Sequence, residues 1–258
     1  MGPTYALDFE QEPWRRIEFD DLRGFFTGAY SSYEWWDDTG DDAPLRIEFT
    51  IGALRPAIST ADAVDTSAGD ASVQILDHSG EVVGAYPIWG VRMRYQEPGL
   101  VVVTAYAQLL AHRLAEAMWD SRRLGLPTEN NSWAALPEEG REAWLEVVRV
   151  GASPVASDSR DRVIHLDGRQ VTDLAGYFLA LGEAVNGPGG YFGANFAAVT
   201  DCLLGGHGVE GALTLIWHDF EVARQSMTRV VQTGDGPMPC VDIAVSSLRE
   251  NGVELIFP

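Results

Sequence analysis

The chain contains no lysine. All 18 basic residues are arginine, and 38 aspartates and glutamates outnumber them, so the formal net charge of the 258 residues is -20 at pH 7. A protein that binds nucleic acid needs basic surface to neutralise phosphate groups, and this charge therefore argues against a direct nucleic-acid partner. A basic protein partner fits better, because opposite charges speed the encounter of two proteins in solution. The missing lysine also excludes a phosphate-binding P-loop.

Cysteine and long apolar runs are scarce as well. Only Cys202 and Cys240 occur, which is not the count of a disulfide framework and fits a reducing compartment. No stretch approaches the ~18 consecutive apolar residues of a membrane helix. The first residues lack the basic and apolar regions of a secretory signal. We therefore expect a cytoplasmic protein without a membrane partner.

Catalytic and metal-binding motifs are missing too. The five histidines show no close metal-ligand spacing, and no Gly-x-Ser-x-Gly sequence occurs. A Gly-x-Gly-x-x-Gly sequence spans residues 206–211, but it follows a predicted helix and precedes a predicted strand, the reverse of the dinucleotide-binding context, so we interpret it as a loop. We expect no catalytic residue, cofactor or metal site, and a protein that is not an enzyme. An acid–base pair in the first half of the chain stays open as an alternative.

What the chain does have is enough apolar sequence, 46% of its residues, for two domains. Residues 45–51 alternate apolar and polar, residues 72–77 and 81–86 flank a turn, and residues 89–95 and 100–104 follow, a pattern typical of an antiparallel meander. Helical spacing over residues 106–118 predicts a helix that covers this sheet. A second helix is predicted from Pro137, with Trp144, Val147 and Val148 facing inward.

An acidic and aromatic segment lies early in the chain, at residues 30–38, with Asp41 and Asp42 directly after it. Aromatic residues are enriched in binding hot spots, so this segment is a candidate second contact surface for a basic partner. Its two tryptophans equally fit a local core, since tryptophan is mostly buried. Both readings stay open.

The last hundred residues alternate strands and helices. Strands are predicted at residues 163–166, 213–217 and 253–257, and helices after a cap at Thr172, at residues 219–227 and at residues 241–248. Strands separated by helices imply a parallel sheet with helical crossovers. We therefore expect an α+β domain of unknown role at residues 1–150, a linker at residues 151–160 and an α/β domain at residues 161–258.

The stretch from residue 187 to residue 206 joins a Gly/Pro-rich loop to a short helix. Asn195 is a suitable N-cap, and Gly205 and Gly206 end the helical pattern. At roughly 100° per residue one side of the helix is predicted to face the core and the other to face outward. The inward side holds Phe196, Ala198, Val199, Cys202 and Leu203, and the outward side holds Ala197, Thr200, Asp201 and Leu204. Asp201 is thus either a solvated surface carboxylate or a binding group.

Residues 191–195 (YFGAN) and 200–203 (TDCL) resemble the binding loop and second helix of the barstar-like ribonuclease inhibitor family. Residues 163–168 (VIHLDG) resemble its first strand and turn, residues 213–220 (LTLIWHDF) its middle strand and the start of its third helix, and residues 241–257 its last helix and strand. The resemblance implies a three-stranded parallel sheet with helices. It also implies a 1:1 complex with a basic ribonuclease or ribonuclease-like toxin whose active site is blocked.

The same resemblance implies roles for particular residues. Asp201 corresponds to the carboxylate that occupies the enzyme's phosphate pocket, and Tyr191 to an aromatic contact. Gly193 and Asn195 correspond to the loop groups that approach the enzyme, and Ala197 and Thr200 belong to the same binding face.

The chain departs from the family at three positions of that face. Ala197 replaces an aspartate, Thr200 replaces a tryptophan and Ser247 replaces a glutamate. The face has lost charge and area, which favours a divergent toxin as target or a contact supplemented by the first domain. Two other functions stay open: an enzymatic first domain with a barstar-like docking module, and a scaffold that inhibits nothing.

Overall fold

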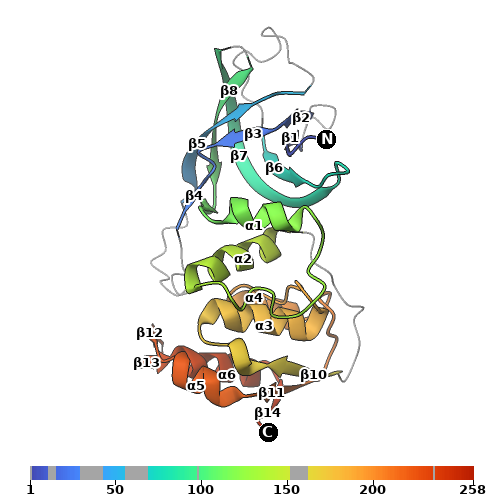
Figure 1. Ribbon diagram of the computed structural model, residues 1–258. Coiled ribbons are helices and arrows are strands. Elements are labelled where there is room, and N and C mark those ends of the chain that lie inside the picture. The colour runs from blue at the N-terminus through green and yellow to red at the C-terminus, as the bar shows by residue number, and fades with distance from the viewer. Residues whose placement is uncertain are drawn as a thin grey trace. The chain divides into compact units, whose positions relative to one another are not determined.

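The computed structural model describes residues 2–10, 16–29, 43–55, 69–97, 99–151, 162–234 and 236–258 (Figure 1). Within these ranges the chain forms two compact units. One holds the residues up to Gly125 together with residues 150 and 151, and the other holds Leu126–Arg149 and everything from residue 162. The predicted two-domain organisation is confirmed. The acidic and aromatic segment at residues 30–38 and nearly all of the predicted linker lie outside the described residues.

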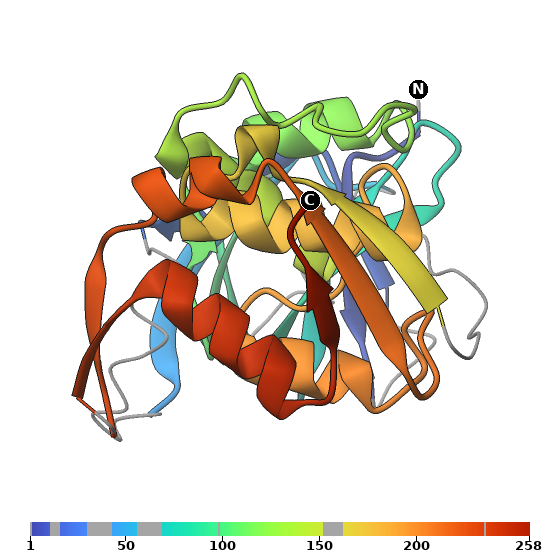
Figure 2. The same ribbon diagram turned by 90° about the horizontal axis from the view of Figure 1, so that it is seen from below.

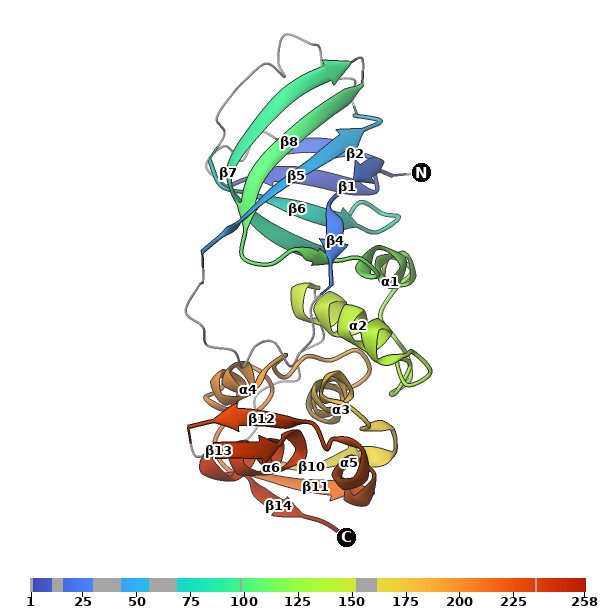
Figure 3. The same ribbon diagram turned by 90° about the vertical axis from the view of Figure 1, so that its left-hand side faces the viewer.

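The first unit is built on a seven-stranded antiparallel sheet with the order β2-β1-β6-β7-β8-β5-β3. Successive hairpins connect β6, β7 and β8, so the predicted meander is confirmed, and Figure 3 shows β7 and β8 as long curved strands. A small parallel pair, β4 and β9, accompanies the sheet. The strands are β1 (Tyr5–Phe9), β2 (Arg16–Phe19), β3 (Asp21–Arg23), β4 (Phe26–Gly28), β5 (Leu45–Gly52), β6 (Ala71–Leu76), β7 (Val82–Glu97), β8 (Leu100–Ala107) and β9 (Ala111–His112).

The helix of the first unit, α1 (Ala115–Arg122), packs on this sheet through Trp119. The indole N–H of Trp119 donates a hydrogen bond of 2.9 Å to the hydroxyl of Tyr86, and the ring lies where a Cβ atom on Gly84 would be. The predicted helix over residues 106–118 was wrong in its start. Tyr106 instead pairs with Arg46 in the sheet, because strand pairing on both sides of β8 outweighs the helical spacing.

The second unit contains a three-stranded parallel sheet, β10-β11-β14, which Figure 2 shows with its strands side by side. The predicted three-stranded parallel sheet with helices is confirmed. A hairpin of β12 and β13, which the sequence did not predict, precedes the last helix. The strands are β10 (Arg162–Asp167), β11 (Leu213–His218), β12 (Val230–Thr233), β13 (Gly236–Pro239) and β14 (Glu254–Ile256); the α-helices are α2 (Glu138–Val150), α3 (Leu174–Asn186), α4 (Phe196–Leu203), α5 (Phe220–Ser226) and α6 (Cys240–Glu250).

Helix α3 lies between α2 and the parallel sheet, as Figures 1 and 3 show. Its burial is nearly complete, with 12 of its 13 residues buried. The N-cap is Asp173, whose carboxylate accepts a hydrogen bond of 2.7 Å from the backbone N–H of Gly176. The predicted cap at Thr172 was therefore one residue early. A helix buried this completely needs cover on more than the sheet side.

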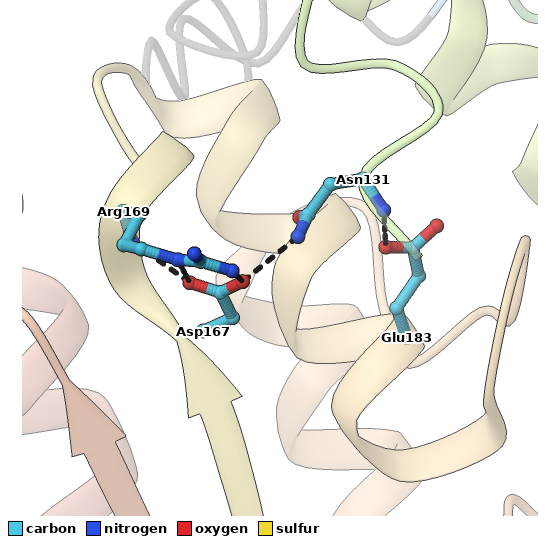
Figure 4. Close-up of polar contacts among 4 residues, drawn as sticks. All are labelled: Asn131, Asp167, Arg169 and Glu183. Carbon is cyan, nitrogen blue, oxygen red and sulfur yellow. Dashed lines mark hydrogen bonds and ion pairs between the residues drawn. The ribbon is translucent and has the colours of Figure 1, made fainter. Parts of the chain in front are cut away.

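Residues 126–149, called the α2 segment below, provide that cover through a set of polar contacts (Figure 4). The side-chain amide of Asn131 donates to the carboxylate of Asp167 at 2.9 Å, and its backbone N–H donates to the carboxylate of Glu183 at 2.7 Å. The guanidinium of Arg141 pairs with the Asp173 carboxylate at 2.7 Å, and both side chains are nearly buried. We propose that the C-terminal folding unit begins at residue 126 and includes this segment.

Among the described residues, no helix combines the length and apolarity that crossing a membrane would require.

Candidate functional site

The loop that precedes α4 is fastened to the end of α3. The side-chain amide of Asn186 donates hydrogen bonds to the backbone carbonyls of Tyr191, at 2.7 Å, and His207, at 3.1 Å. The carbonyl of Gly190 lies so close to Gly182 that a Cβ atom there would be only 2.3 Å from it. The loop therefore follows the surface of α3 in one defined course.

Gly193 lets this loop turn tightly against the helix that follows. Its φ is +94°, in the left-handed region, and a Cβ atom would lie 2.6 Å from the backbone nitrogen of Val199. Gly193 is itself buried. The structure thus gives this predicted site residue a role in shaping the loop.

Asn195 starts α4 in the predicted manner. Its backbone is extended, and its side-chain oxygen accepts a hydrogen bond of 2.7 Å from the backbone N–H of Ala198. This bond satisfies one of the backbone donors that the first turn of a helix leaves open. The predicted N-cap is confirmed, and the side-chain oxygen of Asn195 is committed to the helix.

The two sides of α4 differ as the periodicity predicts. Phe196, Val199 and Cys202 are buried, and the Phe196 ring packs against Phe178 with a centroid distance of 5.2 Å. Asp201 lies exposed on the other side. Within the described residues its carboxylate has no hydrogen-bond or ion-pair partner. A short helix held by three buried side chains therefore presents one negative charge to solvent.

Tyr191 lies half-buried in the loop, and its ring contacts His207 with a centroid distance of 6.3 Å. Burial above all raises the pKa of its hydroxyl to about 12, and the charge of Asp201 adds a smaller contribution in the same direction. The phenol is therefore protonated at neutral pH. Its oxygen accepts a hydrogen bond from the backbone N–H of Ala194, which ties the ring to the loop.

Beside Asp201, the polar edge of α4 is tied to the end of α6. The Thr200 hydroxyl donates to the carbonyl of Phe196 at 3.1 Å, and the amide of Asn251 donates to that hydroxyl at 3.2 Å and to the carbonyl of Ser247 at 2.8 Å. The sequence reasoning missed Asn251, because no periodic pattern connects the end of one helix with another 51 residues away. This edge is polar and uncharged.

The cysteines offer no chemistry to this face. Both are free and buried, and burial raises the pKa of each thiol to about 11. A thiol of that pKa is protonated at neutral pH and is a poor nucleophile. The prediction that Cys202 turns toward the core is confirmed.

A family model described as "Barstar (barnase inhibitor)" matches residues 162–255. The match begins with β10 and reaches β14, so it includes the loop and helix described above but neither the first unit nor the α2 segment. In a comparison with curated proteins, none matches the chain. The resemblance stated for the last part of the sequence is confirmed: residues 162–255 form a barstar-like domain.

Proposed function

We propose that this protein is an inhibitor of a basic ribonuclease or ribonuclease-like toxin, acting as an immunity protein or antitoxin in the cytoplasm through a 1:1 complex that covers the enzyme's active site. The observation that carries this proposal is the exposed carboxylate of Asp201, which has no partner among the described residues, on a helix whose other side is buried in the core. The family match at residues 162–255 supplies the class of partner.

The physical basis is charge substitution. A ribonuclease must hold an RNA phosphate with cationic side chains, and a carboxylate can accept the same charge-assisted hydrogen bonds. The net charge of -20 steers a basic protein toward this chain from a distance. Because buried side chains already hold α4 against the core, little conformational entropy is lost when Asp201 enters such a pocket.

The other residues of the proposed face divide by role. Tyr191 offers a ring and a protonated hydroxyl to the partner, while Gly193 and Asn195 act by fixing the course of the loop. Ala197 and Thr200 bring no charge, and Thr200 is bonded within the domain. Ser247 is equally uncharged, so Asp201 carries the face's electrostatic recognition. This arrangement favours a target that differs from the guanyl-specific ribonuclease bound by the family.

The test is capture of a basic partner by the full chain, followed by inhibition assays with Asp201 variants. Asp201→Ala should weaken inhibition tenfold or more, because the partner's cationic groups are left desolvated and unpaired, and Asp201→Arg should weaken it further. Neither change should shift the melting temperature much, since the side chain is exposed. Glu81→Ala is the control, because it removes an exposed carboxylate from the first unit.

A second experiment tests whether the charge missing from the binding face weakens binding. Ala197→Asp restores an exposed carboxylate one turn before Asp201 and should strengthen binding to a guanyl-specific ribonuclease. An Asp201→Ala protein that folds normally and inhibits as well as the parent would remove α4 from the mechanism. In that case the first unit becomes the candidate binder.

A further inference from the structure

Two histidines meet on the exposed face of the parallel sheet, away from the α4 face. Strands β10 and β11 pair in parallel, and Asp167 lies opposite His218 in register, so His165 is a diagonal neighbour of His218. Ile164, Leu166 and Trp217 alternate with them and are buried on the opposite face. His165 is exposed and His218 half-buried, so solvent reaches both imidazoles.

The two rings face each other through single nitrogen atoms. Nδ1 of His165 and Nε2 of His218 are 2.8 Å apart, the ring centroids are 5.2 Å apart and the ring planes differ by 13°. At that distance one ring donates an N–H to the lone pair of the other. One nitrogen from each strand therefore points toward the other, and a single hydrogen-bonding proton lies between them.

We propose that His165 and His218 form a binding site for a divalent transition-metal ion of the class that prefers imidazole ligands, with Cu²⁺ bound more tightly than Ni²⁺ or Zn²⁺. The metal takes the place of the shared proton; that proton passes to solvent, and the donor ring takes up a proton from solvent on its other ring nitrogen, so both ligands are neutral imidazoles. Metal–nitrogen distances of about 2.0–2.1 Å place two neighbouring ligand nitrogens roughly 2.9 Å apart in the square-planar geometry of Cu²⁺ and roughly 3.3 Å apart in the tetrahedral geometry of Zn²⁺. The rings therefore need to tilt for either ion, and for Zn²⁺ the nitrogens also need to separate by about half an ångström, which exposed side chains achieve by small χ rotations.

The site has two protein ligands, with its other positions left to water or to a partner's side chain. The neighbouring carboxylate of Asp167 is already occupied by the guanidinium of Arg169, at 2.6 Å, and by Asn131. In the part of the chain that the structure describes, no group of three or more His, Cys, Asp or Glu side chains is arranged to hold a metal ion. The pair was invisible to spacing rules because 53 residues separate its members, and only the parallel pairing of β10 and β11 brings them together.

The experiment is a calorimetric titration of the full chain, stripped with a chelator, with Cu²⁺, Ni²⁺ and Zn²⁺ separately. We expect each chain to bind one ion at its highest-affinity site. The bound ion should raise the melting temperature, and the chelator should reverse the rise, because an ion that binds only the folded state stabilises it. His165→Gln and His218→Gln should each weaken binding tenfold or more. The double variant should lose little beyond either single change, since one loss already ends chelation. His78→Gln, at an exposed turn, is the matched control.

Equal affinity in the parent and in His218→Gln, or an equal loss in His78→Gln, would overturn the proposal. NMR of the wild-type protein is a second measurement, and it does not depend on whether a variant folds. Substoichiometric Cu²⁺ should broaden the NMR ring signals of His165 and His218 before those of His78 and His207. Uniform broadening of all exposed histidines would equally refute a chelating pair.

Discussion

At the scale of single residues, Gly193 occupies a position that excludes a larger side chain for two separate reasons. Its backbone is in the left-handed region and it also approaches Val199 closely, whereas Gly211 shares the positive φ, at +84°, with nothing within 4 Å of a Cβ atom. The two glycines therefore separate the cost of backbone strain from the cost of a steric clash.

Gly193→Ala should destabilise the protein clearly more than Gly211→Ala. Placing alanine at a positive φ costs about 1–2 kcal/mol, which both variants share, and the overlap with Val199 adds to it only at Gly193. Urea unfolding gives the two free energies, and partner binding by Gly193→Ala should fall because the loop shifts. Similar losses at both positions would mean that the loop moves freely away from α4.

The orientation of α4 could be predicted from the sequence, and its surroundings could not. In any helix with a period of 3.6 residues, Phe196 and Asp201 fall on different sides. The inward and outward sides of α4 therefore follow from spacing alone. The hydrogen bonds of Asn251 and the meeting of His165 with His218 depend on chain packing across 51 and 53 residues. No local pattern encodes such distances.

At the scale of secondary-structure elements, the α2 segment is held by an ion pair that is nearly buried, unlike the ion pairs on the surface. Arg141 and Asp173 have side-chain exposures of 12% and 7%, whereas the Arg169–Asp167 pair has exposures of 68% and 32%. Burial raises the pKa of Asp173, and the hydrogen bond from the Gly176 N–H and the charge of Arg141 oppose that rise. Arg141 is therefore the cationic partner of a nearly buried carboxylate.

Arg141→Met should cost about 3–5 kcal/mol, because it leaves the Asp173 carboxylate buried without a cationic partner. The exposed control, Arg169→Met, should cost much less, because solvent screens a surface ion pair. Without Arg141 the pKa of Asp173 rises further above its ordinary 3.8, so the ionised form is the costly one. The deficit is therefore largest at neutral pH and shrinks as the pH falls and Asp173 takes up a proton. A deficit that stays constant into acid would contradict this account.

The α2 segment also sets where the C-terminal folding unit starts. From the sequence we expected that unit at residues 161–258, because small and polar residues precede residue 161 and the segment behind it contains a complete sheet. The contacts of Asn131 and Arg141 with the barstar-like domain are not visible in composition. A helix and its turn assigned to the first domain by sequence order thus pack with the second.

A fragment of residues 126–258 should therefore unfold cooperatively at a higher temperature than a fragment of residues 162–258. Removing the α2 segment uncovers one side of α3, and exposed apolar surface there lowers stability. Calorimetry of the two fragments tests this, with the dye ANS reporting exposed apolar surface. Equal melting temperatures would show that α3 is covered by other elements of the barstar-like domain.

At the scale of the whole molecule, charge is divided between two parts with separate roles. Residues 126–258 contain 18 acidic and 8 basic residues, so they carry half of the net charge of -20, and residues 1–125 carry the other half. The residues proposed to touch the partner all lie in the C-terminal half. The first half therefore contributes to the long-range field without a proposed direct contact.

Deleting residues 1–125 should slow association with the captured basic partner and flatten the dependence of the on-rate on salt. Steering depends on the total field and is screened over about 8–10 Å at 0.1–0.15 M ionic strength, whereas the off-rate depends on short-range contacts around Asp201. The off-rate of the 126–258 fragment should therefore stay close to that of the full chain. Stopped-flow mixing at several salt concentrations measures both rates. If the full chain and the fragment have equal salt slopes, the first unit does not steer the encounter; if the fragment dissociates much faster, the first unit touches the partner directly.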